Sequence, residues 1–261
     1  MNPTPATLTL RQAVRPFLDS IPVTNPILVG VSGGTDSLAL ALALKHEAKD
    51  HVVIPVVIDH GLQNNSAKVA TDAIVELEKI GYTNIESQRV NVVIEDGIEA
   101  SARRARYEAF EAAAAKYQCQ HFFLAHTEND LAESVLLGLA RGSGTRSLSG
   151  IAPINGIYIR PLLGVSRKTT EKVCEENRIT AWHDPHNDDL DFSRVRVRKN
   201  ILPMMESELS PKVISALART SKILREDADA LDSYALEYLH GEDPLAIDSL
   251  ARLPKAVRVR V

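Results

Sequence analysis

A glycine-rich turn that carries hydroxyl side chains and one carboxylate lies near the start of the chain, at residues 32–37. It joins an apolar run, predicted to be a buried strand, to an alanine- and leucine-rich segment, predicted to be a helix. Glycine lets the backbone approach a ligand closely, and the N–H groups at a helix start attract anions. We therefore predict that nucleotide phosphates contact the whole turn: Ser32, Gly33, Gly34, Thr35, Asp36 and Ser37.

The turn differs from the common P-loop because no Gly-Lys-Ser/Thr follows it. Asp36 stands in place of the lysine, and a carboxylate about 4 Å from a phosphate repels it unless a cation lies between them. The pattern therefore predicts Mg²⁺ between Asp36 and phosphate oxygens. A purely structural glycine turn is the alternative, and the complete pattern between a strand and a helix favours the phosphate site.

Two arginines three residues apart, Arg103 and Arg106, share one face of the helix predicted at 98–116. Arginine binds phosphate or carboxylate through a planar fork and keeps its charge. The pair is therefore a candidate phosphate site. A surface ion pair between Glu99 and Arg103, four residues apart, explains one of the two arginines equally well.

A polar face follows the strand predicted at 121–125 and comprises His126, Asn129, Asp130 and Glu133. The two carboxylates are suited to a metal ion or a cationic amine, whereas zinc is not expected, because only one histidine is present. An ordinary amphipathic helix is the alternative. Position at the carboxyl end of a strand favours function.

These groups need a scaffold, and the chain predicts alternating strands and helices. Strands are expected at 27–31, 52–58, 85–93, 121–125 and 157–163, and helices at 7–18, 37–46, 67–80, 98–116, 128–140 and 168–177. Such alternation predicts an α/β fold with a doubly wound parallel sheet, in which ligands bind at the carboxyl ends of the strands. From residue 210 only helical periodicity remains. We predict a catalytic domain at 1–205 and a helical substrate-binding domain at 206–261. The last residues continue a helix-like pattern without a stop signal, so the second domain is expected to be a candidate for truncation.

Composition narrows the class of protein. The 261 residues carry a net charge of −4, which argues against indiscriminate coating of nucleic acid, although Arg194, Arg196, Arg198 and Lys199 form a local basic stretch. No apolar run is long enough to span a membrane, and no secretory signal begins the chain. Cys119 and Cys174 are far apart, so we expect a cytoplasmic protein without disulfides.

The turn at 32–37 resembles the loop of the N-type ATP pyrophosphatases, which cleave ATP to AMP and pyrophosphate. The further motifs, in their order, resemble the tRNA(Ile)-lysidine synthetases over about residues 25–205: Arg103 and Arg106 before Tyr107, the 126–133 segment, Arg-Gly-Ser-Gly at 141–144 and Arg-Pro-Leu-Leu at 160–163. The chain departs from the family pattern at Asn129, where aspartate is usual, at His186, where serine is usual, and at Val195, where asparagine is usual.

The resemblance implies a ligase that uses ATP and Mg²⁺ to join L-lysine to the wobble cytidine of the tRNA(Ile) CAU anticodon. The cytidine is adenylated with release of pyrophosphate, and the lysine amine then displaces AMP. It also implies residue roles. The catalytic residues would be Asp36, Arg106, Asp130 and His126, and the metal ligands would be Asp36 and Asp130. The substrate-binding residues would be Arg103, Asn129, Glu133, Arg194 and Arg198. Either His126 or a carboxylate accepts the amine proton, and a homodimer is one option for the assembly.

Three other functions are the alternatives to this one. A tRNA thiolase of the same superfamily usually needs clustered cysteines, which this chain lacks. A synthetase or amidotransferase for a free metabolite does not account for the basic stretch. A nucleotide-binding module without catalysis is supported only by Asn129 and the abrupt carboxyl end, and the intact 32–37 turn argues against it.

Overall fold

The computed structural model describes residues 3–61, 65–95, 97–241 and 246–261. The chain forms two compact units that alternate along the sequence. Unit 1 comprises Met1–Asp130 and Ala152–Val195, and unit 2 comprises Leu131–Ile151 and Arg196–Val261. Helix α5 (Glu128–Ala140) therefore begins in unit 1 and continues in unit 2. The predicted boundary at residue 205 separates a catalytic domain from a substrate-binding domain, and this division of function stays a prediction.

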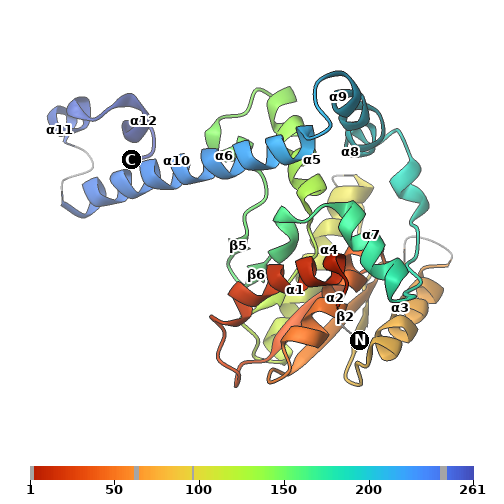
Figure 1. Cartoon of the computed structure of the whole chain (residues 1–261). Coiled ribbons are helices and arrows are strands. Elements are labelled where there is room, and N and C mark those ends of the chain that lie inside the picture. The colour runs from red at the N-terminus through yellow and green to blue at the C-terminus, as the bar shows by residue number, and fades with distance from the viewer. Residues whose placement is uncertain (1–2, 62–64, 96, 242–245) are drawn as a thin grey trace. The chain divides into compact units, whose positions relative to one another are not determined.

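Unit 1, whose strands β2, β5 and β6 are labelled in Figure 1, contains a six-stranded sheet with the strand order β3-β2-β1-β4-β6-β5. Its strands are β1 (Ile27–Val31), β2 (Val53–Asp59), β3 (Glu86–Arg89), β4 (Phe122–Phe123), β5 (Ile154–Asn155) and β6 (Tyr158–Ile159). All neighbours pair in parallel except β5 and β6. The predicted doubly wound parallel sheet is confirmed. The chain leaves β1 toward β2 and β3 and returns to β4 on the other side, which makes the carboxyl ends of β1 and β4 the switch point where ligands bind.

Helices cover both faces of this sheet. Residues of α1 (Pro5–Leu18), α2 (Thr35–Glu47), α3 (Ser66–Ile80) and α7 (Arg167–Glu176) share one core, and α4 (Ile98–Lys116) packs in the other. Alternate residues of β1 point to opposite cores, Val29 to the first and Leu28 to the second. A Cβ at Gly30 would lie 3.0 Å from the ring of Phe110, so glycine lets α4 pack closely on the strand.

Three strand predictions were too long. The strand expected at 85–93 ends at Arg89, and the one expected at 121–125 pairs only at Phe122 and Phe123. The strand expected at 157–163 stops because Pro161, which has no N–H to donate, starts the 3₁₀ helix η1 (Pro161–Gly164). The segment 183–193 contains the short 3₁₀ helix η2 (Pro185–Asp188).

Unit 2 is helical, which confirms the small carboxyl-terminal helical part. Besides most of α5, it contains α6 (Thr145–Leu148), the π-helix η3 (Val197–Ile201), α9 (Leu202–Glu208), α10 (Val213–Gly241), α11 (Ile247–Arg252) and α12 (Lys255–Arg258), while α8 (Ser193–Arg196) leads into it. Ala132, Val197 and Leu202 form its buried cluster. Within the described ranges, no helix combines the length and apolar character needed to cross a bilayer.

Candidate active site

The predicted phosphate turn lies at the carboxyl end of β1 and opens helix α2. Gly34 is the N-cap residue and has no side chain to cap the first turn, so the amides of that turn are left for a ligand. Ser37 holds the turn together: its hydroxyl donates to the Gly34 carbonyl at 2.9 Å and accepts from the Ser32 N–H at 3.2 Å. The backbone is thus shaped before any anion binds.

Gly33 takes a conformation that favours glycine, with φ of +80°. A Cβ there would also lie 3.2 Å from the Cβ of Ala73 on α3. The Gly33 carbonyl accepts a hydrogen bond of 2.9 Å from the N–H of Trp182, which ties the turn to the segment after α7. A larger residue at this position would disturb the turn from both sides.

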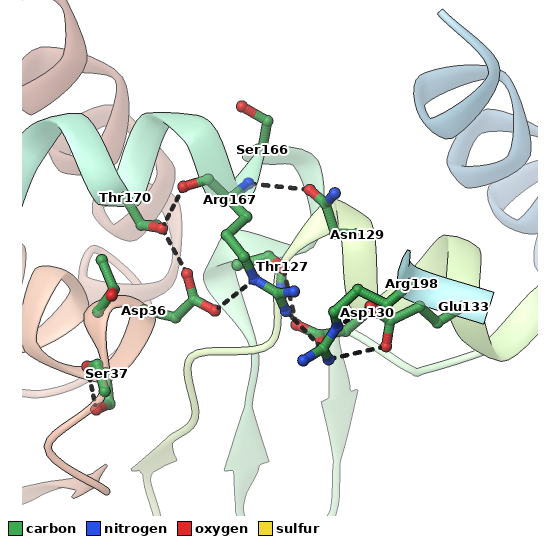
Figure 2. A network of polar contacts seen from close by, with 12 residues as sticks. Asp36, Ser37, Thr127, Asn129, Asp130, Glu133, Ser166, Arg167, Thr170 and Arg198 are labelled. Atoms are coloured by element: carbon green, nitrogen blue, oxygen red, sulfur yellow. Dashed lines mark hydrogen bonds and ion pairs between the residues drawn. The ribbon is translucent and has the colours of Figure 1, made fainter. Parts of the chain in front are cut away.

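Asp36, in the first turn of α2, faces helix α7 (Figure 2). The Thr170 hydroxyl donates to its Oδ1 at 2.5 Å, and Nε of Arg167 lies 3.3 Å from its Oδ2. Burial raises the pKa of this carboxyl, while the Arg167 charge and the Thr170 hydroxyl act in the opposite direction. Asp36 is therefore a shielded carboxylate directly behind the phosphate turn.

Arg167 also reaches Asp130 and so connects two predicted site residues. Its Nη2 lies 3.1 Å from Oδ1 of Asp130, and Oδ2 of Asp130 accepts from the N–H and hydroxyl of Thr127 at 2.8 and 2.7 Å. Burial acts to raise the pKa of Asp130, but Arg167 and Thr127 outweigh it and hold the pKa below its usual value. The guanidinium thus bridges carboxylates at the switch point (Figure 2).

Asn129 holds the backbone that carries this bridge. Its Oδ1 accepts a hydrogen bond of 3.0 Å from the N–H of Arg167, the first residue of α7. Sequence reasoning missed Arg167 and Thr170. A usable signal existed, because an arginine in the first turn of a helix opposes the helix dipole unless anions face it.

The contacts of the two aspartates bear on the predicted metal site. No group of three or more His, Cys, Asp or Glu side chains gathers to hold a metal within the part of the chain that the structure describes. The oxygens of Asp36, at the phosphate turn, fit Mg²⁺ that is held chiefly by substrate phosphates and by one or two carboxylates. Both oxygens of Asp130 already accept hydrogen bonds, Oδ2 from Thr127 and Oδ1 from Arg167, so a metal ion there would compete with Arg167 for Oδ1.

The two arginines of α4 lie near different strands. Nε of Arg106 donates to Nε2 of His60, the residue after β2, at 3.3 Å. The Arg103 guanidinium lies 5.0 Å from the centre of the Tyr107 ring, and its charge acts on His126, which follows β4. Since β2 and β4 flank β1, positive charge lies on both sides of the phosphate turn. The Glu99 side chain lies outside the described residues, so its alternative pairing with Arg103 stays open.

A cavity of about 390 Å³ lies where β2 and β3 end, beside the phosphate turn in the order of the strands. Its lining residues come from the segments that follow these two strands: His60, Gly61, Arg89, Val90, Asn91 and Val92.

His126 is a half-buried imidazole that stays neutral at pH 7. Burial lowers its pKa to about 4; Asp130 opposes this, and the charges of Arg160, Arg103 and Arg194 reinforce it. Its Nδ1 has no hydrogen-bond partner among the described residues. The ring is neutral, as a proton acceptor must be, but a pKa of about 4 makes it a weak base.

The lowered pKa of His126 predicts a loss of stability in mild acid. Below the ordinary value of 6.5 the unfolded chain takes up a proton that the folded chain refuses until about pH 4, so stability is lost as the pH falls through this window. Between pH 7 and pH 5 this costs about 2 kcal/mol. Urea unfolding at both pH values will show that His126→Gln loses about 2 kcal/mol less than the parent. His183→Gln, at an exposed histidine, will behave like the parent; an equal loss for His126→Gln would refute the assignment.

The remaining predicted residues form one strong contact and one weak one. In unit 2, Glu133 is fully buried, and the Arg198 guanidinium donates one hydrogen bond to each of its two carboxylate oxygens, with Nε–Oε1 at 2.7 Å and Nη2–Oε2 at 3.0 Å. In unit 1, Nη2 of Arg194 lies 3.5 Å from the Asp130 carbonyl oxygen. The substrate-binding roles of these residues stay predictions.

The parallel sheet, its switch point and the turn at 32–37 define a PP-loop nucleotide-binding domain, and the family model described as a PP-loop domain matches residues 6–205. A tRNA(Ile)-lysidine synthase of Leifsonia xyli subsp. xyli (strain CTCB07) is 46% identical, over 90% of this chain and 74% of that one. A tRNA(Ile)-lysidine synthase of Thermobifida fusca (strain YX) is 43% identical, over 100% of this chain and 82% of that one. The chain belongs to the tRNA(Ile)-lysidine synthase family.

One solved structure supports the fold. A U34-tRNA thiolase, NcsA, from Methanococcus maripaludis superposes with a TM-score of 0.67 at 18% sequence identity, over 84% of this chain and 80% of that one. At this identity the likeness concerns the fold alone.

Proposed function

We propose that this chain ligates L-lysine to the wobble cytidine of the tRNA(Ile) CAU anticodon, with ATP as co-substrate. Its membership of the family supports the reaction. The observation that carries the proposal in the structure is the bridge from Asp36 through Arg167 to Asp130. It joins the phosphate turn at β1 to the polar segment after β4, so that a nucleotide and an amine can meet at one edge of the sheet.

In the first half-reaction ATP lies with its phosphates on the 32–37 turn and its nucleoside toward the 390 Å³ cavity. The cytosine carbonyl oxygen attacks the α-phosphorus, a bond to AMP forms and pyrophosphate leaves. Arg106 stabilises the charge that builds on the α-phosphate. Asp36, together with phosphate oxygens, would hold Mg²⁺, and the ion would neutralise phosphate charge when bound.

In the second half-reaction the side-chain amine of lysine attacks the activated ring carbon and AMP leaves. Asp130 attracts the ammonium group, and Glu133, one turn later on α5, stays a predicted second carboxylate. The amine must lose its proton before attack, and neutral His126 or the Asp130 carboxylate accepts it. Asn129 keeps α7, and with it Arg167, in place beside Asp130.

The tRNA must present its wobble base unstacked, because the reacting atoms are not accessible within a stacked loop. Arg103 and Arg194 are proposed contacts for the RNA. We propose a cytoplasmic location, where tRNA and lysine are both present, and a homodimer stays a prediction.

Sulfur transfer is not favoured as an alternative. The chain has two cysteines, and both are buried as free thiols. Burial raises the pKa of Cys119, and it raises the pKa of Cys174 to about 12, so neither is a ready thiolate at neutral pH.

The decisive test measures pyrophosphate release from ATP with tRNA(Ile) and lysine supplied together or singly. Release will require tRNA, and lysidine will form only when lysine is present. Asp36→Asn will lower the rate at least about a hundredfold, because the charge that holds Mg²⁺ at the phosphates is lost. Asp50→Asn, at an exposed aspartate just beyond α2, will behave like the parent. The proposal would be contradicted if pyrophosphate were released at the same rate without tRNA, or if the Asp36→Asn variant were as active as the parent.

A further inference from the structure

His60 and Arg106 form a contact that the mechanism above does not use. They are 46 residues apart in the chain, His60 at the end of β2 and Arg106 on α4. Nε of Arg106 donates to Nε2 of His60 at 3.3 Å, so Nε2 must carry the ring's lone pair. An arginine has five N–H donors, and this bond takes the one nearest its aliphatic chain.

The state of the ring agrees with this arrangement. Burial and, to a smaller extent, the Arg106 charge lower the pKa of His60 to about 4, against the opposing effect of Asp59 and Asp184. The ring is thus neutral at pH 7 and can accept the guanidinium hydrogen. When Nε2 accepts, the proton sits on Nδ1, which is buried and has no partner among the residues described.

A buried donor without a partner costs about 1–3 kcal/mol, so packing alone does not explain a histidine at this position. His60 also lines the 390 Å³ cavity where we place the nucleoside of ATP. The residue therefore touches both the proposed nucleoside pocket and the arginine proposed for the α-phosphate.

We propose that His60 is a positioning residue that holds the Arg106 side chain by its Nε–H, so that the outer guanidinium N–H groups meet the α-phosphate of bound ATP. This role rests on the proposed function of Arg106. His60 itself does not transfer a proton. Its contribution is to fix the arginine before the transition state forms, when a loose side chain would lose much of its stabilising effect.

The test compares His60→Ala, His60→Gln and Arg106→Ala with the double variant His60→Ala/Arg106→Ala, in pyrophosphate release with saturating tRNA and lysine. His60→Ala will lower kcat about tenfold or more and change the KM for ATP less than about threefold. His60→Gln, whose side-chain oxygen can accept the same hydrogen, will restore most of kcat. In the Arg106→Ala background the loss of His60 will add less than about twofold.

Two kinetic outcomes would overturn the proposal. One is a rise in KM with kcat unchanged, which would make His60 a nucleoside contact. The other is full additivity of the His60 and Arg106 losses, which would make the two residues independent. Urea unfolding of each variant separates these results from a failure to fold.

A second measurement does not depend on turnover. The ¹⁵N spectrum of histidine-labelled full-length chain at pH 7 will show the Nδ1–H tautomer of His60, and Arg106→Ala will shift its Nε2 resonance. The contact would be refuted if His60 were the Nε2–H tautomer, or if its Nε2 chemical shift were the same in the parent and in Arg106→Ala. Either result would count even if the enzyme is active. A parent protein that releases no pyrophosphate but shows the expected spectrum would instead refute the proposed function.

Discussion

Arg167→Ala will lower the rate of tRNA-dependent pyrophosphate release about a hundredfold or more. Arg167 contacts Asp36 at 3.3 Å and Asp130 at 3.1 Å, and without it the two carboxylates face each other with less positive charge between them. The Asp130 charge already acts to raise the pKa of Asp36, and removing Arg167 strengthens that effect. Hydrogen bonds to charged groups contribute about 1.5–3 kcal/mol each, and about 2.7 kcal/mol corresponds to a hundredfold in rate.

Steady-state kinetics across a Mg²⁺ titration will check this result. Lys168→Ala is the matched control, because Lys168 carries the same charge on the next residue of α7 and is exposed. Arg167→Lys will be intermediate, since it keeps a charge but cannot bridge two carboxylates through a planar fork. If saturating Mg²⁺ restored Arg167→Ala to the parental rate, the proposed catalytic contribution of Arg167 would be refuted. The guanidinium would then only occupy the position of the metal ion when no ligand is bound.

Arg198→Ala will lower the free energy of unfolding by about 3 kcal/mol, because it removes a two-point ion pair from a buried carboxylate. Glu133 is fully buried in unit 2, and both of its oxygens are bound by the Arg198 fork. The two residues are 65 positions apart, so their bond also fixes η3 against α5 within that unit. The loss will be seen as a lower urea midpoint in a transition that follows helical circular dichroism.

The double variant Glu133→Leu/Arg198→Met will recover much of this stability, since apolar side chains of similar size can replace a buried ion pair. Arg219→Ala, at an exposed arginine of α10, will change the free energy by less than about 0.5 kcal/mol. A small loss for Arg198→Ala would mean that water reaches the Glu133 carboxylate. In that case Arg198 would again be a candidate contact for tRNA phosphates.

Much of this protein could be predicted from local pattern. The helices at 98–116 and 128–140 have the predicted bounds, and Gly81 ends α3 in the left-handed conformation. The order of strands and helices was sufficient to predict the parallel sheet, and the 32–37 turn lies at the carboxyl end of β1 as expected. These features depend on side-chain period, caps and backbone freedom, which act over a few neighbouring residues.

Tertiary structure alone decided which distant side chains meet. Arg167 reaches Asp36 across 131 positions and Asp130 across 37, and no local period encodes such distances. It also decided that Glu133 is paired with Arg198, that Arg106 rests on His60, and that the helical unit takes residues 131–151 as well as the carboxyl-terminal segment. The physical reason is that charge pairing and burial depend on which elements pack together, and packing is a property of the whole folded chain.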